Sequence, residues 1–457
     1  MSKTKKKSFV IIGVAVLAIL CFMIFLLVSA FKTEKSIPMK DLQGEIFAHV
    51  EWDGVSEKFV ADDEYVKAYA CTAFNEALDI VSLQQKEFKG DIKDYFFENV
   101  TEIKTNFNKD FSVRLNEAFQ KSDLQDSSCE MAVTDLNGKL IAVFTTGNEE
   151  TPYSVTDTYV GSTIKPLSVF APAIETGKYN WSSMIEDAPV SQIKNEFGEY
   201  TDWPVNANNE YTYENVTLAD ALMDSTNTVA VHLLKAIGVK KAMDTLENKY
   251  GFNLEYEKEK TKSTDETEVL GNIALGYLYK GASVIDMAGS FQPFANGGFY
   301  SKPLAVDEIL SGETSIYKAE YKGQRVISEA TTEVLNKMLQ NIARGGTGKD
   351  AYVDGVKVGG KTGTTSGNKD NWFVGFTPEY SCAVWHSFSE KGNIAAAIFA
   401  SVFENIEAVE NSYPHSDDVI SEFYCNKSGK LRSANCKTAN RGYYVKNNVP
   451  TICDECK

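Results

Sequence analysis

Three short strings, far apart in the chain, constrain this protein more than any other feature of its sequence. They read Ser162-Thr163-Ile164-Lys165, Ser225-Thr226-Asn227 and Lys361-Thr362-Gly363. Each string alone is common at helix starts and surface turns. In this order they supply two serines, two lysines and an asparagine from three segments that only a folded domain can bring together. We therefore predict one active site, built from all three strings around a serine nucleophile.

The first string has the residue types of an activated nucleophile. If a helix begins at Ser162, the side chain of Lys165 lies on the same face one turn later. A desolvated lysine can be neutral enough to take the serine proton, and a helix N-terminus favours the negative charge that develops there. Pro166 is compatible with a first helical turn. For this string alone, the alternative is an ordinary N-cap serine followed by an exposed lysine.

Histidine usage supports lysine as the base. The four histidines all lie far from Ser162 in sequence, at His49, His232, His386 and His415. Nothing therefore favours a Ser-His-Asp triad. No histidine–cysteine spacing suggests a catalytic metal, and we expect neither a metal nor another cofactor at the site.

Cysteines gather at the C-terminal end. Four of the eight fall in the last 33 residues, at Cys425, Cys436, Cys453 and Cys456. We predict disulfides among them, because disulfides are permitted outside the membrane. A four-cysteine zinc site is the alternative.

The first 31 residues predict a membrane anchor. Lysines at positions 3, 5, 6 and 7 precede an apolar run over residues 9–31 that is long enough to span a bilayer. We predict a cytoplasmic tail over residues 1–7, a single-pass anchor in the cell membrane over 8–31, and an extracellular remainder. A cleaved signal peptide is the alternative. The net charge of −17 argues against nucleic acid as a partner.

Periodicity divides the rest of the chain into three regions. Residues 32–127 show helical spacing over 65–86 and 91–119, and we predict a helical membrane-proximal stalk or linker. Residues 128–412 mix strands and helices and carry all three strings. Residues 413–457 form a cysteine-containing tail.

Inside the middle region the strands lie at both ends. A hairpin over residues 131–144 turns at Asn137-Gly138, and a strand over 356–365 carries the third string, followed by a hairpin over 372–388. Helices are predicted over 217–237, 274–294 and 393–406. This order predicts an α+β domain whose sheet joins the two ends of the region.

The residues around the three strings resemble the transpeptidase domain of class A penicillin-binding proteins. The similarity includes Gly161 and Pro166 around the first string, Trp203-Pro204-Val205-Asn206 and Val216-Thr217-Leu218 before the second, and residues 360–365 and 370–378 around the third. It covers about residues 128–410, and the tail is similar to that of some Gram-positive members. The resemblance implies the serine β-lactamase/DD-peptidase fold, an antiparallel sheet flanked by helices.

Two departures from related families shape the prediction. Class A proteins carry a glycosyltransferase domain before the transpeptidase, but roughly a hundred residues between the anchor and residue 128 are too few for another catalytic domain of ordinary size. We therefore expect a transpeptidase that works with a separate glycan polymerase. No Glu-x-x-Leu-Asn string, which carries the deacylating glutamate of class A β-lactamases, lies between Asn227 and Lys361. Efficient penicillin hydrolysis is therefore not indicated.

The resemblance also implies a reaction. A peptidoglycan stem peptide ending in D-alanyl-D-alanine would be the donor, and the amine of a second stem peptide would resolve the acyl-serine. β-Lactams would imitate the donor and stall at that stage. The implied catalytic residues are Ser162 as nucleophile, Lys165 as its base, Ser225 as proton relay, Asn227 as holder of the peptide backbone and Lys361 as a positive charge. The implied substrate-binding residues are Thr362, Gly363 and Thr364.

The sequence leaves two other functions open. Water in place of the acceptor amine would make the protein a D,D-carboxypeptidase, or a β-lactamase of the same fold. A non-enzymatic β-lactam sensor or wall-assembly scaffold is the third possibility. A sensor needs a cytoplasmic signalling part, and only a short segment precedes the apolar run.

Overall fold

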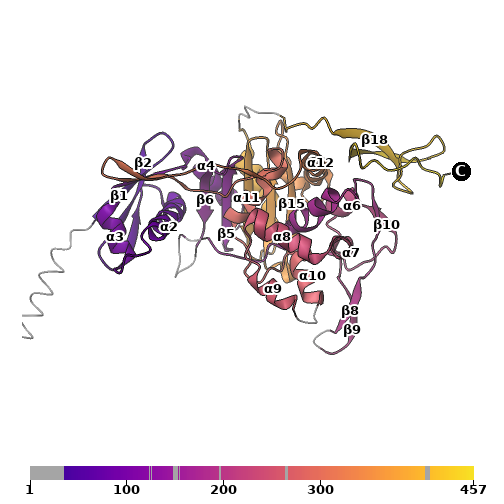
Figure 1. Cartoon of the computed structure of the whole chain (residues 1–457), viewed down its shortest axis with the longest axis horizontal. Coiled ribbons are helices and arrows are strands. Elements are labelled where there is room, and N and C mark those ends of the chain that lie inside the picture. Colours follow the sequence, from indigo (N-terminus) through magenta and orange to yellow (C-terminus); the bar gives the residue numbers. More distant parts are fainter. Residues whose placement is uncertain are drawn as a thin grey trace, which may run out of the picture.

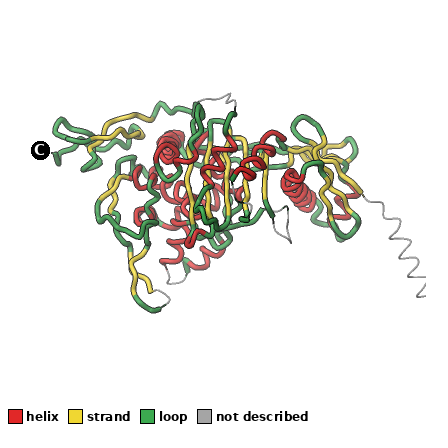
Figure 2. Tube along the Cα trace, turned by 180° about the vertical axis from the view of Figure 1, so that it is seen from behind, coloured by secondary structure: helices red, strands yellow, loops and turns green. Residues whose placement is uncertain are grey.

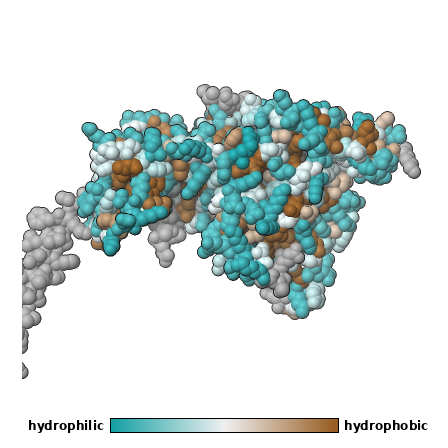
Figure 3. Space-filling view, in the orientation of Figure 1, coloured by the Kyte–Doolittle hydropathy of each residue, from teal (hydrophilic) through white to brown (hydrophobic). Residues whose placement is uncertain are grey.

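The computed structural model describes residues 35–456, apart from positions 123, 125, 148–152, 154, 195–196, 263–265 and 407–411. The predicted cytoplasmic tail and membrane anchor, residues 1–31, lie outside the described residues. Within the described part of the chain, we find no helix long and apolar enough to cross a membrane. The face of the molecule seen in Figure 3 is covered mainly by hydrophilic residues, with hydrophobic residues in small separate groups.

A five-stranded antiparallel sheet lies at the centre of the molecule, in the order β15-β16-β17-β5-β6 (Figures 1 and 2). Its strands are β5 (Cys129–Asp135), β6 (Leu140–Thr145), β15 (Gly359–Thr364), β16 (Asn371–Phe376) and β17 (Tyr380–His386). The predicted α+β domain is confirmed, because strands from the two ends of the region form one sheet. β16 is buried along its whole length, as expected for a strand covered on both faces.

Helices cover the two faces of this sheet. On one face, Val374 of β16 belongs to the same hydrophobic cluster as Phe291 of α11 (Val284–Ala295). On the other, the neighbouring Phe373 packs with Phe399 of α13 (Ala395–Phe403), which lies beside α4 (Lys109–Lys121). Side chains alternate between the faces of a strand, so the sheet separates two cores. The predicted helix over residues 393–406 corresponds to α13.

A helical lobe stands beside the edge strand β15. It contains α6 (Leu218–Met223), α7 (Asn227–Ile237), α8 (Val239–Tyr250), α9 (Glu255–Lys260) and α10 (Glu266–Leu275). Helix α12 (Glu329–Gly345) packs against both β15 and α6, and so connects the sheet to the helical lobe.

Two of the predicted helices are interrupted. The helix expected over 217–237 is divided into α6 and α7 by residues 224–226, and the one expected over 274–294 is divided between α10 and α11. Gly276 has a φ of +82°, which ends α10, and Ser283 and Asp286 form a capping box that starts α11. Both breaks lie at the candidate site.

The N-terminal region corrects the prediction of a helical stalk over residues 32–127. Four of its segments are strands of a six-stranded sheet in the order β13-β12-β4-β1-β2-β3. These strands are β1 (Lys35–Lys40), β2 (Ile46–Trp52), β3 (Glu57–Val60), β4 (Glu102–Thr105), β12 (Val306–Ser311) and β13 (Thr314–Lys318). Helices α2 (Lys67–Gln84) and α3 (Ile92–Asn99) pack beside it, so the helical spacing over 65–86 is confirmed.

The chain returns to this sheet long after leaving it. β12 and β13 follow α11, and β12 pairs with β4 (Figure 1). The boundary predicted at residue 127 therefore does not separate two independent units. Tyr69 of α2 connects the N-terminal region to the central sheet. Its hydroxyl lies 2.6 Å from the carbonyl oxygen of Leu140 in β6 and 3.1 Å from that of Ala305, next to β12. Glu76 of the same helix accepts backbone hydrogen bonds from Ala305 and Val306.

Short two-stranded sheets and 3₁₀ turns complete the described structure. The pairs are β7 (Met184–Glu186) with β10 (Asn215–Thr217), β8 (Ser191–Lys194) with β9 (Tyr200–Trp203), β11 (Phe299–Tyr300) with β14 (Gln324–Arg325), and β18 (Val419–Cys425) with β19 (Ala439–Val445). Further 3₁₀ turns are Glu64–Val66, Lys349–Ala351 and Ser366–Asn368, of which the last two contribute to the candidate site.

The tail differs from the prediction of disulfides. Within the described residues the sulfur atoms of Cys425, Cys436, Cys453 and Cys456 lie together, and no disulfide bond joins any of them. The β18–β19 hairpin that carries this cluster lies at the end of the molecule opposite the N-terminal sheet (Figure 1).

Candidate active site

Ser162 lies in a helical segment whose turns tighten and then widen. A 3₁₀ turn over Gly161–Ile164 leads into a π-helical turn over Pro166–Phe170 and then into α5 (Ala171–Glu175). The predicted helix start at Ser162 is therefore confirmed, although its first turn is tighter than an α-helix. The backbone N–H groups of Val160 and Gly161 both donate to the carbonyl oxygen of Gly276, at 3.2 Å. Gly276, directly after α10, thus fixes the position of the segment that carries Ser162.

Lys165 is fully buried one turn after the serine. Its Nζ donates to the carbonyl oxygen of Ser225 at 2.6 Å and to Oδ1 of Asn227 at 2.7 Å, and it lies 3.3 Å from Oγ of Ser225. Burial lowers the pKa of Lys165 well below the usual value, and the nearby Lys361 lowers it further. Among the hydrogen bonds of the described residues, none joins this amine to Oγ of Ser162. Catalytic hydrogen bonds are often long before substrate binds.

Ser225 occupies the turn between α6 and α7 rather than a helix. Its φ is +61°, a sparsely populated conformation for a residue with a side chain. The turn presents the carbonyl oxygen and the hydroxyl of this one residue to Lys165. The hydroxyl also accepts a hydrogen bond from Nζ of Lys361 at 2.8 Å. Ser225 therefore lies between the two lysines.

Asn227 begins α7 and is held on both sides. Its amide nitrogen Nδ2 donates to the carbonyl oxygen of Val205 at 2.7 Å, while its backbone N–H donates to Oδ1 of Asn206 at 2.9 Å. Asn206 is itself buried and donates to Asp187 and to the carbonyl oxygen of Glu210. Asn206 is a positioning residue that the three strings do not include; only its place in the Trp203-Pro204-Val205-Asn206 segment could have indicated it.

Lys361 reaches the same network from strand β15. Its Nζ donates to Oγ of Ser225 and, at 2.9 Å, to the carbonyl oxygen of Thr362. The side chain is fully buried, and this burial lowers the pKa of Lys361 to about 7. Two buried amines that share one hydroxyl repel each other when both are charged. The site therefore disfavours a positive charge on both amines at once.

Gly363 allows β15 to approach the serine segment. A Cβ atom at this position would lie 2.5 Å from the carbonyl oxygen of Val160 and 2.9 Å from Cγ2 of Thr163. The residue is buried, and its close packing sets the distance between the strand and Ser162. The substrate-binding role expected for Gly363 stays a prediction.

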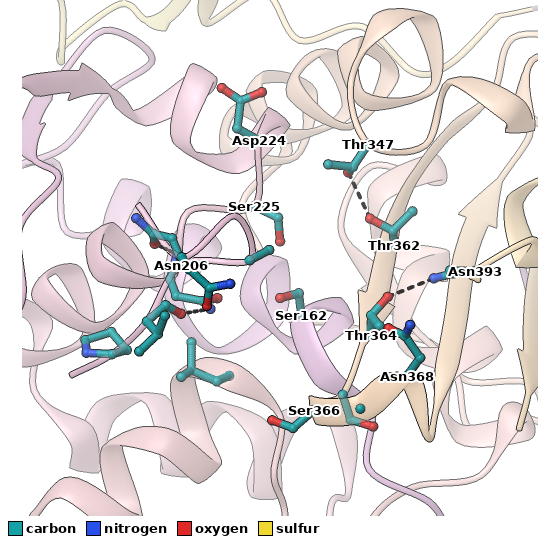
Figure 4. A pocket seen from close by; sticks show the side chains of 18 of the residues that line it. Ser162, Asn206, Asp224, Ser225, Thr347, Thr362, Thr364, Ser366, Asn368 and Asn393 are labelled. Atoms are coloured by element: carbon teal, nitrogen blue, oxygen red, sulfur yellow. Dashed lines mark hydrogen bonds between the residues drawn. The ribbon is translucent and has the colours of Figure 1, made fainter. Parts of the chain in front are cut away.

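A cleft of about 760 Å³ opens between β15 and the α6–α7 lobe. Ser162 lies in it between Ser225 on one side and Thr362 and Thr364 on the other (Figure 4). Its described wall consists of Ser162, Trp203, Pro204, Val205, Asn206, Ala207, Asn209, Asp224, Ser225, Asn227, Leu275, Tyr277, Thr347, Asp350, Thr362, Thr364, Thr365, Ser366, Gly367, Asn368, Asn393 and Ala396.

Two polar pairs orient the hydroxyls of β15 in this wall. Oγ1 of Thr362 donates to Oγ1 of Thr347 at 2.8 Å, and Nδ2 of Asn393 donates to Oγ1 of Thr364 at 3.1 Å (Figure 4). Asn393 also donates to the carbonyl oxygen of Gly363 at 3.0 Å. Sequence reasoning did not identify Thr347 or Asn393, because each lies outside the three strings.

The arrangement suits acyl transfer through a serine. A hydroxyl at the start of a helical segment faces an open polar cleft, with buried amines able to take and return a proton. In the part of the chain that the structure describes, the residues grouped closely enough to hold a metal ion are the four tail cysteines, which do not line this cleft.

Comparison with known proteins agrees with this geometry. A family model described as "Penicillin binding protein transpeptidase domain" matches residues 132–404. The chain is 34% identical over 238 residues to penicillin-binding protein 1F of Bacillus subtilis, which covers 50% of the chain and 30% of that protein. It is 30% identical over 324 residues to penicillin-binding protein 1A of Clostridium tetani, which covers 64% and 39%. These matches thus span less than half the length of either relative.

Solved structures share the fold. The D,D-transpeptidase domain of a peptidoglycan glycosyltransferase from Eggerthella lenta has a TM-score of 0.61 at 19% identity, and covers 81% of this chain and 97% of that one. A ceftriaxone acyl-enzyme complex of penicillin-binding protein A from M. tuberculosis also has a TM-score of 0.61, at 17% identity, and covers 81% and 98%.

Proposed function

The chain belongs to the penicillin-binding protein transpeptidase family, and we propose that it is a peptidoglycan D,D-transpeptidase that works through an acyl enzyme on Ser162. One observation carries this proposal. Lys165, Ser225, Asn227 and Lys361 form a continuous hydrogen-bonded network beside Ser162 at the base of the cleft. The three strings that supply them are 60 or more residues apart in the chain.

The proposed first step moves one proton and exchanges one bond. Oγ of Ser162 attacks the carbonyl carbon of the penultimate D-alanine while Nζ of Lys165 takes its proton. The carbon–nitrogen bond to the terminal D-alanine then breaks. The proton passes to the leaving nitrogen through Oγ of Ser225, which lies 3.3 Å from Nζ of Lys165. Burial supports this role, because it lowers the pKa of Lys165 and so favours the neutral amine that can accept a proton.

Charge and hydrogen bonds would orient the donor. We propose that Lys361, with the hydroxyls of Thr362 and Thr364, attracts the terminal carboxylate, and that Asn227 contacts the peptide backbone. The backbone N–H groups of Ser162 and Thr364 would stabilise the oxyanion. Their segments lie close enough for this, since a Cβ at Gly161 would be 3.1 Å from the backbone nitrogen of Thr364.

The second step distinguishes transpeptidation from hydrolysis. An acceptor amine from another stem peptide loses a proton to Lys165 and attacks the ester carbonyl carbon. The bond from that carbon to Oγ of Ser162 breaks, and Lys165 returns the proton to this oxygen. Water in its place would make the protein a D,D-carboxypeptidase. The carboxylates in the described wall of the cleft are those of Asp224 and Asp350, and no glutamate lines it. We therefore propose that the acyl enzyme formed with penicillin is hydrolysed slowly.

Covalent labelling tests the nucleophile. The purified protein is incubated with a fluorescent penicillin and its intact mass is measured. We expect one adduct, mapped to Ser162, and none in Ser162→Ala. Ser366→Ala is the matched control, because Ser366 also lines the cleft and bonds Tyr277, and it should label normally. An adduct elsewhere, or labelling of Ser162→Ala, contradicts the proposal.

Product analysis tests the reaction. The protein is mixed with a peptide ending in D-alanyl-D-alanine, with and without an amine acceptor of stem-peptide type. A transpeptidase forms the peptide–amine product in preference to the hydrolysed peptide. Hydrolysed peptide as the sole product in both mixtures would instead assign D,D-carboxypeptidase activity to the same acyl enzyme.

We also propose that the catalytic domain works outside the cell, tethered to the cytoplasmic membrane and supplied by a separate glycan polymerase. The lysines and apolar run of residues 1–31 support the tether. The fold of residues 35–121 supports the separate polymerase. Their strands form one sheet with β12 and β13 of the later chain, so these residues are not a catalytic domain of their own. Protease added to intact spheroplasts should remove the domain. Full protection would contradict the tether, and polymer made from lipid-linked disaccharide by the purified chain would contradict the second part.

A further inference from the structure

The tail brings four cysteine sulfurs to one point. Cys425 ends strand β18, Cys436 lies in the loop before β19, and Cys453 and Cys456 come from the last residues of the chain. Their four Sγ atoms all lie within 4.8 Å of one another. Three separate segments therefore converge through these side chains.

The four side chains form the interior of this small lobe. Cys425, Cys436 and Cys453 are buried and make a cluster of their own, against which only Cys456 packs among the hydrophobic residues described. The lobe thus has no apolar core of leucine, valine or aromatic residues at this point. Small structural units without such a core are usually held by disulfides or by a metal ion.

The distances favour a metal over two disulfides. A zinc ion surrounded by four thiolates has zinc–sulfur distances of about 2.3 Å, and a regular tetrahedron of that size separates the sulfurs by about 3.8 Å. Sγ of Cys425 lies 3.5 Å from Sγ of Cys456. A disulfide needs a separation of about 2.05 Å. The tail's sulfur geometry is therefore close to that of a metal site without rearrangement.

Polar groups around the sulfurs support the thiolate form. The backbone N–H and the hydroxyl of Ser433 both lie 3.3 Å from Sγ of Cys436, and the hydroxyl of Ser428 donates to Sγ of Cys453 at 3.3 Å. Donors of this kind orient and stabilise metal-bound thiolates. Cys453 and Cys456 are also separated by two residues, a spacing frequent in structural zinc sites.

The charge of the C-terminal lobe also favours a zinc ion bound by four thiolates. Residues 425–457 carry seven basic residues and two acidic ones, although the whole chain has a net charge of −17. A zinc ion with four thiolates has a net charge of −2. Basic surroundings stabilise such a centre, and they offer nothing comparable to a pair of neutral disulfides.

We propose that Cys425, Cys436, Cys453 and Cys456 form a structural zinc site that closes the C-terminal lobe. All four ligands come from the protein, so the site is closed and takes no part in the chemistry of the cleft. The lobe packs on the transpeptidase domain through Tyr444, whose hydroxyl donates to Oγ of Ser182 at 2.9 Å. Zinc therefore holds the end of the chain in its folded form on that surface.

Metal analysis of the full protein tests the site without a variant. The chain is purified without added metal, and its zinc content and free thiols are measured on the same sample. We expect one zinc per chain, and four tail thiols that alkylate only after the metal is chelated. Replacement of zinc by cobalt should give the visible absorption bands of a tetrahedral cobalt–thiolate centre. Protein with two intact tail disulfides and no zinc would overturn the proposal.

Variants separate metal binding from packing. Cys436→Ser should lower zinc content at least tenfold, whereas Cys456→His should retain zinc, because three cysteines and a histidine are also a common zinc site. A histidine cannot restore a disulfide, so retained zinc in Cys456→His excludes that alternative. Cys71→Ser is the matched control and should keep the full zinc content. Loss of zinc in the control, or zinc unchanged in Cys436→Ser, would refute the assignment.

Labelling by penicillin provides an independent readout. Ser162 lies outside the tail, so the folded Cys456→His protein should label at the wild-type rate. The zinc proposal does not rest on the proposed function: failure of labelling in the wild-type protein bears on Ser162, and zinc content bears on the tail cysteines.

Discussion

Replacement of Gly363 by alanine is the sharpest test of how this site is assembled. The added methyl group would meet the carbonyl oxygen of Val160 at 2.5 Å, Cγ2 of Thr163 at 2.9 Å and Cβ of Trp372 at 3.2 Å. Because the first two distances are below 3.0 Å, the strand or the serine segment must move. The carbonyl of Val160 alone requires a displacement of roughly 0.5–1 Å.

The displacement has two expected effects. Overpacking of a buried contact costs about 1–3 kcal/mol of folding free energy, which for a domain of this size lowers the melting temperature by roughly 2–10 °C. Movement of β15 also shifts Thr364 and Lys361 away from Ser162. A misplacement of about 1 Å can slow a reaction roughly 100-fold. We therefore expect acylation to fall by about two orders of magnitude, far more than the small loss of stability explains.

The assay is the second-order rate of labelling by a fluorescent penicillin, measured below the melting temperature of each variant. Gly345→Ala is the matched control: it is the same substitution near the end of α12, and its new Cβ has no neighbour within 4 Å. It should label at the wild-type rate. If folded Gly363→Ala also labels at that rate, then close packing of β15 on the serine segment does not position the site, and our reasoning is wrong.

Three further predictions test the network. Lys361→Met should stabilise the protein more at pH 6 than at pH 9. The pKa of Lys361 is lowered to about 7, so the unfolded chain binds more protons between pH 7 and 10; wild-type stability then rises over that range by up to about 1.4 kcal/mol per pH unit relative to the variant, measured by denaturant titration. A pH-independent difference would contradict this. Asn206→Ala should cost about 1–3 kcal/mol, since it leaves the backbone N–H of Asn227 unpaired, and should also slow penicillin labelling; unchanged labelling would show that Asn206 does not position the site. Tyr69→Phe should cost about 1 kcal/mol at the joint with the N-terminal sheet and leave labelling per folded molecule unchanged.

The sequence by itself indicated which residues belong to the candidate site and that an α+β domain surrounds them. Ser162 and Lys165 were predicted from residue type and spacing, and Ser225, Asn227 and Lys361 from the family resemblance of the strings. The structure joins Lys165, Ser225, Asn227 and Lys361 by direct hydrogen bonds. The central sheet was also predictable. Its strands are short apolar runs bounded by turn residues, a local signal.

The N-terminal sheet was not predicted, although one of its strands carried a signal. β2 alternates inward and outward, with Ala48, Val50 and Trp52 buried. Its neighbour β1 contains Pro38 and two lysines, which weaken the strand pattern. Two other strands of the sheet, β12 and β13, come more than 200 residues later in the chain than β1 to β4. Strand pairing over such distances is decided by tertiary contacts, which no local pattern reports.

The tertiary structure also decided what the motif residues do. Ser225 appeared helical because its neighbours are, yet it lies in a turn at positive φ where both its polar groups reach Lys165. Gly363 was predicted from its string alone, and only the structure shows that a methyl group there would meet Val160 and Thr163. The four tail cysteines were predicted to form disulfides, with zinc as the alternative, but their sulfurs lie within 4.8 Å of one another without a disulfide bond. Sequence spacing records which groups are present, but packing sets the distances, and proton transfer and metal binding depend on distance.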